Sequence, residues 1–212
     1  MIIAVDGPAA AGKGTIARAL ATHFGYHFLD TGALYRMVGL AVIRSARDPA
    51  DTRAAIAAAT SLDPSGFADR DLRTEAVGAA ASIVAVVPEV RSALLSLQRD
   101  FARKQPGAVL DGRDIGTVIA PDADVKIFVV ASPKARAYRR FLELKERGDS
   151  VNETEILADI LKRDERDRSR AAAPLVRAPD AHLLDTTHLD IDAAIRAAID
   201  IVEATRAGRG RA

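Results

Sequence analysis

The chain opens with a short apolar run, residues 1–5 (MIIAV), that leads into a glycine-rich segment, residues 7–15 (GPAAAGKGT). From residue 14 to residue 24, apolar side chains then recur at the spacing of one helix face. This order predicts a buried strand, a tight glycine turn and a helix. Within the turn, Gly7, Gly12 and Lys13 match the pattern G-x-x-x-x-G-K, which in this context is typical of a phosphate-binding loop.

The residue types of this loop suit a triphosphate. Glycines let backbone N–H groups approach phosphate oxygens, the helix N-terminus favours negative charge, and Lys13 supplies a positive charge for the β and γ oxygens. Gly14 stands where Ser or Thr usually follows the lysine, so the hydroxyl comes one place later, at Thr15. A glycine-rich turn without a ligand is the structural alternative. We expect ATP or GTP to bind to Gly7, Pro8, Ala9, Ala10, Ala11, Gly12, Lys13, Gly14 and Thr15.

Strand and helix patterns alternate along most of the chain. Buried strands are also predicted at 108–110, 125–130 and 182–184, and helices at 33–45, 88–103, 133–147, 152–170 and 191–206. This alternation predicts an α/β fold with a parallel β-sheet core and helices on both faces, in which ligands bind beyond the carboxyl ends of the strands. Residues 47–86 are alanine-rich and lack a strand pattern, so we expect a helical excursion there.

Composition narrows the function classes. A chain of 212 residues fits one domain, expected at 1–205, followed by a frayed tail at 206–212. Its 30 basic and 29 acidic side chains nearly balance, which disfavours bulk binding of nucleic acid. The sequence has no cysteine and no apolar run long enough to span a membrane. We therefore expect a cytoplasmic protein that has no disulfides or thiolate metal sites.

Two polar clusters lie near predicted strand ends. Residues 30–36 (DTGALYR) bring together an acid, a hydroxyl and a base, although helix capping by Asp30 or Thr31 would explain them. Residues 111–114 (DGRD) follow a buried strand, where a parallel sheet carries functional residues. A turn needs only the Asp-Gly pair, so Arg113 and Asp114 favour a functional role.

A third cluster, residues 161–170 (LKRDERDRSR), has five basic and three acidic side chains. A solvated helix with ion pairs between successive turns would explain it. Arg163, Asp167 and Arg170, however, fall at i, i+4 and i+7, on one helix face. Two guanidinium groups and a carboxylate on one face suit the recognition of phosphate and sugar.

In this order and spacing, the segments GPAAAGKGT, DTGALYR, DGRDIGT and RDERDRSR followed by APL make the chain resemble the bacterial cytidylate kinases over nearly its whole length. The resemblance implies the fold of P-loop nucleoside monophosphate kinases, with an NMP-binding excursion at about 33–105 and a lid at about 149–173. It implies a monomer that transfers the γ-phosphoryl group of ATP to CMP or dCMP with Mg²⁺, a step of pyrimidine nucleotide metabolism. Many members carry a longer insert with extra strands where this chain has only residues 61–68.

The resemblance also implies roles for individual residues. Those expected to bind the acceptor are Thr31, Arg36, Ser82, Arg91, Arg113, Asp114, Arg163, Asp167 and Arg170, of which Ser82, Arg91 and Asp114 match positions that contact cytosine. Those expected to act in catalysis are Lys13, Arg113, Arg163 and Arg170. No side chain is assigned as a direct metal ligand, and Thr15 or Asp111 would reach Mg²⁺ through water.

A physical argument supports the assignment to cytosine. Cytosine has an amino donor at N4 and acceptors at N3 and O2, which complement a carboxylate and a guanidinium. Uracil has a carbonyl oxygen at position 4, which Asp114 would repel.

Two alternatives share the phosphate loop. An adenylate or shikimate kinase would use the same core, but the DGRD segment counts against both. A P-loop switch protein would not need an arginine-rich lid, and the sequence lacks the N-K-x-D segment typical of GTPases.

Overall fold

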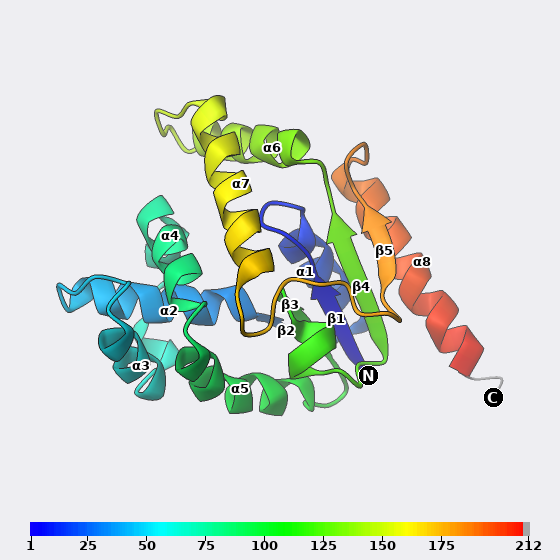
Figure 1. Cartoon of the computed structure of the whole chain (residues 1–212). Coiled ribbons are helices and arrows are strands. Elements are labelled where there is room, and N and C mark those ends of the chain that lie inside the picture. Colours follow the sequence, from blue (N-terminus) through cyan, green and yellow to red (C-terminus); the bar gives the residue numbers. More distant parts are fainter. Residues whose placement is uncertain (210–212) are drawn as a thin grey trace.

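Residues 1–209 are described by a computed structural model of the chain (Figure 1). Its centre is a five-stranded parallel sheet with the order β2-β3-β1-β4-β5. The strands are β1 (Ile2–Asp6), β2 (His27–Asp30), β3 (Ala108–Gly112), β4 (Val125–Val130) and β5 (His182–Asp185). The α/β class and the parallel sheet are as predicted. The sequence pattern did not predict β2, because an edge strand of four residues carries little periodicity.

Eight α-helices and three short helices connect these strands within the described residues. They are α1 (Lys13–Phe24), α2 (Thr31–Arg44), α3 (Thr52–Thr60), η1 (Pro64–Gly66), η2 (Asp69–Arg73), α4 (Glu75–Val84), α5 (Pro88–Ala102), η3 (Ile115–Ile119), α6 (Pro133–Glu146), α7 (Glu153–Ser169) and α8 (Ile191–Arg209). Helix α8 continues past its predicted end at 206, so 206–209 are helical rather than frayed. Residues 210–212 of the predicted tail lie outside the described part of the chain.

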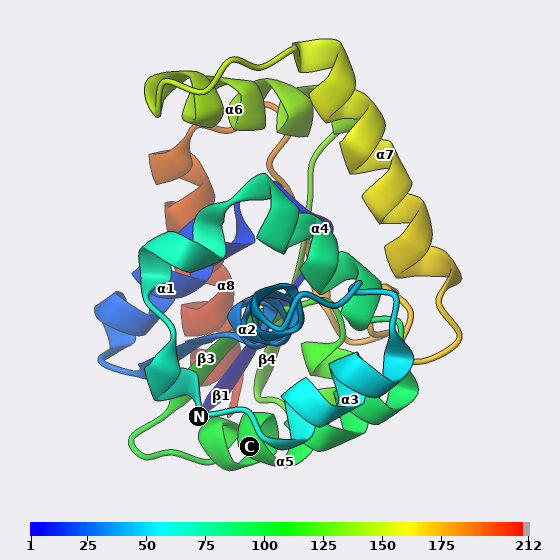
Figure 2. The same ribbon diagram turned by 90° about the vertical axis from the view of Figure 1, so that its left-hand side faces the viewer.

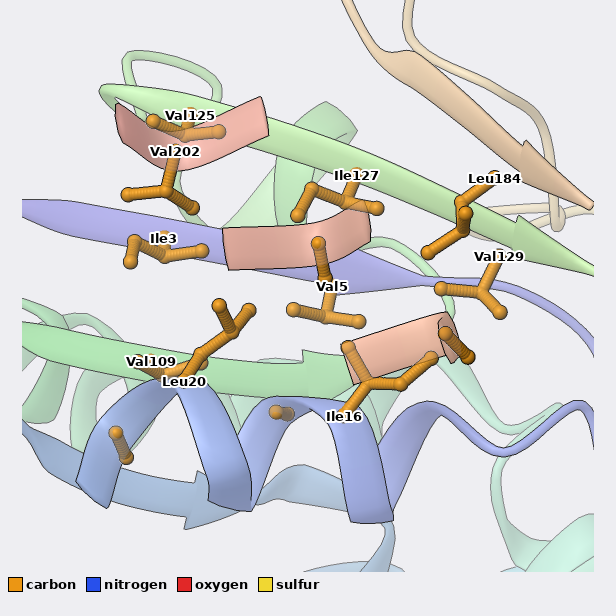
Figure 3. Packing of buried hydrophobic residues seen from close by; sticks show 14 of the residues in the cluster. Ile3, Val5, Ile16, Leu20, Val109, Val125, Ile127, Val129, Leu184 and Val202 are labelled. Carbon is orange, nitrogen blue, oxygen red and sulfur yellow. The ribbon is translucent and has the colours of Figure 1, made fainter. Parts of the chain in front are cut away.

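Alternate strand residues face two different layers of helices. Ile3 and Val5 of β1 are buried against Ile16 and Leu20 of α1 and against α8 (Figure 3). Ala4, between them, belongs to the opposite face, which packs on α5 and η3. The sheet is therefore covered on both faces, as a parallel sheet requires.

Helices α2, α3, α4 and α5 enclose a second core to one side of the sheet (Figure 2). Val38, Val84, Val90 and Leu94 are fully buried in it. The predicted excursion at 47–86 contains α3, η1, η2 and α4 and no strand. Within residues 1–209, no single helix could cross a membrane by length and hydropathy, and only the pair α4 and α5, bent by 101°, passes that test together.

Asp6 ends β1 on the face covered by η3. Its carboxylate accepts hydrogen bonds from the backbone N–H groups of Ile115 and Gly116, both at 2.8 Å. Burial raises the pKa of this carboxyl to about 6, although the two backbone hydrogen bonds oppose the shift. Asp6 thus holds the start of η3 against β1.

The raised pKa of Asp6 predicts a pH dependence of stability. The folded protein binds this proton more tightly than the unfolded chain, whose Asp pKa is 3.8. Protonation therefore stabilises the fold at low pH, and this contribution is lost as the pH rises through the folded pKa. Between pH 5 and pH 7 we expect the free energy of unfolding to fall by roughly 1 kcal/mol through Asp6.

Urea denaturation of the wild type and of the Asp6→Asn variant across this pH range measures the effect. The difference between the two free energies of unfolding should change by that amount. A difference that stays constant with pH would contradict the raised pKa.

Candidate active site

The carboxyl ends of three neighbouring strands meet at one edge of the sheet. Asp30 at the end of β2 pairs in register with Asp111 of β3, which in turn pairs with Val5 of β1, just before the phosphate loop. Beyond this edge lies a cavity of about 1180 Å³, lined by the excursion helices on one side and by α6 and α7 on the other. Parallel pairing therefore brings three distant polar segments to one cavity.

The phosphate loop leaves the first turn of α1 open to an anion. Gly12 caps α1 in the left-handed conformation, with φ 88°, and no side chain accepts a hydrogen bond from the first turn, which also lacks an acidic residue. Gly7 has φ +149°, and a Cβ there would lie 2.0 Å from the carbonyl oxygen of Val129 in β4. The loop thus packs closely on β4 and offers free N–H donors at a helix N-terminus.

Lys13 and Asp111 face each other at the buried floor of the cavity. Lys13 Nζ lies 3.6 Å from Asp111 Oδ1 and donates a hydrogen bond to the carbonyl oxygen of Pro8 at 3.2 Å. Burial lowers the pKa of Lys13 and raises the pKa of Asp111, and each partner opposes the shift of the other. Asp111 Oδ1 is buried without a hydrogen-bond partner. Both charges are therefore incompletely compensated within the protein.

Gly14 makes room for this carboxylate. A Cβ at this position would lie 3.2 Å from Asp111 Oδ2, which is closer than most contacts that Cβ atoms make in proteins. The approach gives a physical reason for glycine at the place where the loop pattern has Ser or Thr. The hydroxyl moves to Thr15, which lines the cavity.

The segment 30–36 acts partly as a helix cap, as the structural alternative predicted. Asp30 accepts a hydrogen bond from the N–H of Ala33 at 3.1 Å and a second, at 2.5 Å, from Nη2 of Arg36. Thr31 is buried, and its hydroxyl donates to the carbonyl oxygen of Asp111 at 2.7 Å. These contacts fix the start of α2 against β3 while Asp30, Thr31 and Arg36 line the cavity.

Arg91, Asp114 and Arg170 form a buried cluster in the cavity wall. Arg91 Nη2 donates to Asp114 Oδ2, and its guanidinium carbon lies 5.4 Å from the centre of the Tyr35 ring. Arg170 Nη2 lies 3.7 Å from Asp114 Oδ1 and has no hydrogen-bond partner. Burial and the nearby Arg91 lower the pKa of Arg170, against the effect of Asp114. Arg170 Nε donates to the carbonyl oxygen of Ala173, so the cluster presents one unsatisfied guanidinium nitrogen, Nη2, beside a carboxylate.

Arg113 and Arg163 connect the end of β3, α4 and α7, which lies in the segment expected to form the lid. Arg113 Nε donates to Asp167 Oδ2 at 2.8 Å, and Arg163 Nη2 donates to the carbonyl oxygen of Gly78 in α4 at 2.7 Å. Burial acts to raise the pKa of Asp167, but Arg113, Arg170 and Arg163 outweigh it and hold that pKa below its usual value. Asp167 is thus ionised among three cations.

All residues expected to bind the acceptor line this cavity. They are Thr31, Arg36, Ser82, Arg91, Arg113, Asp114, Arg163, Asp167 and Arg170. The loop residues that line it are Ala9, Ala10, Lys13, Gly14 and Thr15, whereas Gly7, Pro8, Ala11 and Gly12 do not. The structure thus shows that these side chains lie around one cavity. The role of each side chain in binding or catalysis stays a prediction.

The sequence pattern did not predict Arg140 of α6 and Glu75 of α4, which pair with each other and line the cavity. Arg166 of α7 was not predicted either; it does not line the cavity itself, but it donates from Nη1 to Ser82 Oγ, which does, at 2.6 Å. In the sequence these charges are typical of exposed helix faces. Only the tertiary packing of α6 and α7 against α4 brings them together, so no local signal could have found them.

Comparison with known proteins identifies the family. The family model described as cytidylate kinase matches residues 3–204. The chain belongs to the cytidylate kinase family. A protein named cytidylate kinase from Rhodopseudomonas palustris (strain BisB18) is 62% identical over 211 residues, and one from Bradyrhizobium diazoefficiens is 60% identical, each match covering 100% of both chains.

A solved structure supports the fold independently. A gluconokinase from Sinorhizobium meliloti 1021 matches with a TM-score of 0.51 and 15% sequence identity, over 100% of this chain and 97% of that one. The two cytidylate kinase relatives have a total length similar to that of this chain, because each match spans the full length of both chains. In total length, this chain with its short connection at 61–68 is therefore typical of these two relatives.

The packing of Gly7 predicts the effect of a single methyl group. We expect Gly7→Ala to lower the free energy of unfolding by about 2 kcal/mol or more, because the added Cβ overlaps a backbone oxygen of β4. We also expect loss of ATP binding, since the loop must move to relieve the clash. Urea denaturation and calorimetric titration with ATP measure both effects.

Gly66→Ala is the matched control, because a Cβ there meets nothing within 4 Å. It should leave stability and ATP binding close to those of the wild type. Equal effects of the two substitutions would contradict the packing argument.

Proposed function

We propose that the chain transfers the γ-phosphoryl group of ATP to CMP or dCMP, giving ADP and CDP or dCDP. The observation that carries the proposal is one cavity with two complementary halves. One half has an open helix N-terminus with Lys13, which suits a triphosphate. The other has an arginine-rich wall with a carboxylate, which suits a second nucleotide. The relatives named cytidylate kinase support the choice of acceptor.

In the donor half, the loop and the first turn of α1 would hold the phosphates of ATP through backbone N–H groups. Lys13 would supply positive charge to the β and γ oxygens. In the free protein, burial lowers the pKa of Lys13. A bound phosphate would stabilise its charged form.

Mg²⁺ accompanies ATP in this proposal. The ion prefers oxygen ligands and usually keeps several waters and substrate phosphates rather than a complete protein cage. Among residues 1–209, no three His, Cys, Asp or Glu side chains form a metal site, but Asp111 has in the cavity a carboxylate oxygen that accepts no hydrogen bond. Asp111, together with the Thr15 hydroxyl, would hold the hydrated ion, which neutralises charge on the β and γ oxygens.

In the acceptor half, Asp114 and Arg91 would read the base. Their hydrogen bond presents a carboxylate and a guanidinium side by side. The carboxylate complements the N4 amino group of cytosine, and the guanidinium complements its acceptors. The positive charge of Arg170 and its Nη2 group, which has no hydrogen-bond partner, suit an oxygen of the acceptor or of the group in transfer.

The chemical step needs alignment and charge neutralisation more than covalent help. The phosphate of CMP is already anionic, so a general base is not required. Arg36, Arg113, Arg163 and Arg170 would offset the repulsion between the two phosphates and orient them. The lid around α7 would keep water from the γ-phosphate. The phosphate loop, the arginine-rich wall and α7 all belong to the same chain, so the proposed reaction requires no residue from a second copy.

An acceptor survey tests the proposal. ADP formation from ATP and Mg²⁺ is measured with CMP, dCMP, UMP, AMP or shikimate. We expect CMP and dCMP to stimulate it, and UMP to be at least about 10-fold poorer in kcat/KM, because O4 of uracil would face Asp114 without a proton between them. If CMP fails to stimulate ADP formation, the proposal is refuted. Stimulation by AMP or shikimate alone would favour the rival kinases.

Arg170 provides a test of the acceptor wall. If its guanidinium stabilises charge in the transition state, Arg170→Ala should lower kcat by on the order of 10³. Steady-state kinetics with CMP measures the change. Arg168→Ala is the matched control, since Arg168 is exposed in the last turn of α7, two residues before Arg170, and does not line the main cavity. Unchanged turnover in Arg170→Ala would remove this residue from the mechanism.

A further inference from the structure

A buried ion pair behind the phosphate loop takes no part in the proposed chemistry. Arg136 of α6 is 1% exposed and Asp164 of α7 is 3% exposed. Arg136 Nη1 lies 2.9 Å from Asp164 Oδ1, and Nη2 lies 2.5 Å from Oδ2. Two parallel hydrogen bonds from a planar guanidinium hold a carboxylate in one orientation. The pair therefore fixes α7 relative to α6.

The same guanidinium also reaches the phosphate loop. Arg136 Nη1 donates to the carbonyl oxygen of Ala9, and Nε donates to that of Ala131 directly after β4, both at 3.0 Å. In a trans peptide the C=O and N–H bonds point in opposite directions. The hydrogen bond to Ala9 thus turns the N–H of Ala10 away from Arg136. Ala9 and Ala10 line the main cavity and Arg136 does not, so Arg136 acts on the loop and not on a ligand.

Asp164 directly follows a lid residue that contacts the other side of the cavity. Arg163, its neighbour in α7, donates to Gly78 of α4, on the acceptor side. Two consecutive residues therefore link α7 to α4 and, through Arg136, to the phosphate loop. Figure 1 shows α7 descending from α6 past this loop.

We infer that Arg136 and Asp164 are positioning residues that couple the lid to the phosphate loop, so that ATP in the loop and CMP under α7 strengthen each other's binding. The inference rests on the proposed function, because it assumes two nucleotides in one cavity. Neither charge of a buried ion pair is stable without its partner, so the link between α7 and the loop is kept intact. A loop ordered by phosphate then favours the α7 position that holds the acceptor, and the effect is reciprocal.

The coupling is measured as the ratio of two dissociation constants for CMP. Calorimetry gives the first with CMP alone and the second with CMP in the presence of Mg²⁺ and an ATP analogue that has an imido β–γ bridge. In the wild type we expect CMP to bind about fivefold or more tightly when the analogue is bound. In Asp164→Asn we expect the ratio to fall close to one, because the bidentate link to Arg136 is lost.

A second variant separates coupling from stability. Asp164→Asn leaves the Arg136 charge buried and is expected to destabilise the fold, whereas replacing a buried pair by apolar residues is often neutral. The double variant Arg136→Met and Asp164→Leu removes both charges, although it also leaves the carbonyl oxygens of Ala9 and Ala131 without the Arg136 donor. It should therefore unfold at a denaturant midpoint above that of Asp164→Asn and still lack coupling. Asp180→Asn is the matched control, because Asp180 pairs with Lys126 of β4, away from α7.

The outcomes distinguish this inference from the proposed function. A ratio of one in the wild type, or a wild-type ratio in the folded double variant, would overturn the coupling inference while CMP is still phosphorylated. A ratio close to one in Asp180→Asn would also overturn the coupling inference, because the effect would then not be specific to Arg136 and Asp164. If the wild type neither binds nor phosphorylates CMP, the proposed function itself fails.

Discussion

The parallel register of β2, β3 and β1 is the constraint on which the site depends. Because parallel strands end on the same side, Asp30, Asp111 and the phosphate loop become neighbours although long helical segments separate them in sequence. A one-residue slip of β3 would turn Asp111 to the other face of the sheet and separate it from Lys13. The apolar side chains on both faces oppose such a slip, so the same packing that stabilises the sheet also aligns the charged side chains at its carboxyl edge.

Two charged side chains in the cavity wall have an atom that makes no hydrogen bond within the protein. Asp111 Oδ1 and Arg170 Nη2 are both buried without a hydrogen-bond partner, which costs free energy in the absence of a ligand. These two atoms belong to opposite halves of the cavity, one beside the phosphate loop and one beside Asp114. Local instability of this kind is expected where a protein is organised to bind charged substrates.

Arginine side chains connect parts of the molecule that have separate hydrophobic cores. The sheet is one packed unit, and α2 to α5 enclose another. Arg163 joins α7 to α4 across the cavity, and Arg136 of α6 joins α7 to the phosphate loop behind it. Each of these connections is a small set of directional hydrogen bonds rather than a broad apolar contact. The position of α7 relative to α4 and to the loop therefore depends on a few charged side chains.

The sequence by itself determined the phosphate loop, the α/β alternation and most helix boundaries, because these depend on periodicity and on glycine at defined places. The family resemblance also named, from the sequence, the residues expected to bind the acceptor, and all of them line the cavity. Only the tertiary structure decided that β2 joins the sheet, that Gly14 makes room for Asp111, and that Arg136 reaches both Asp164 and Ala9. These are contacts between segments distant in the chain, for which no local spacing rule exists.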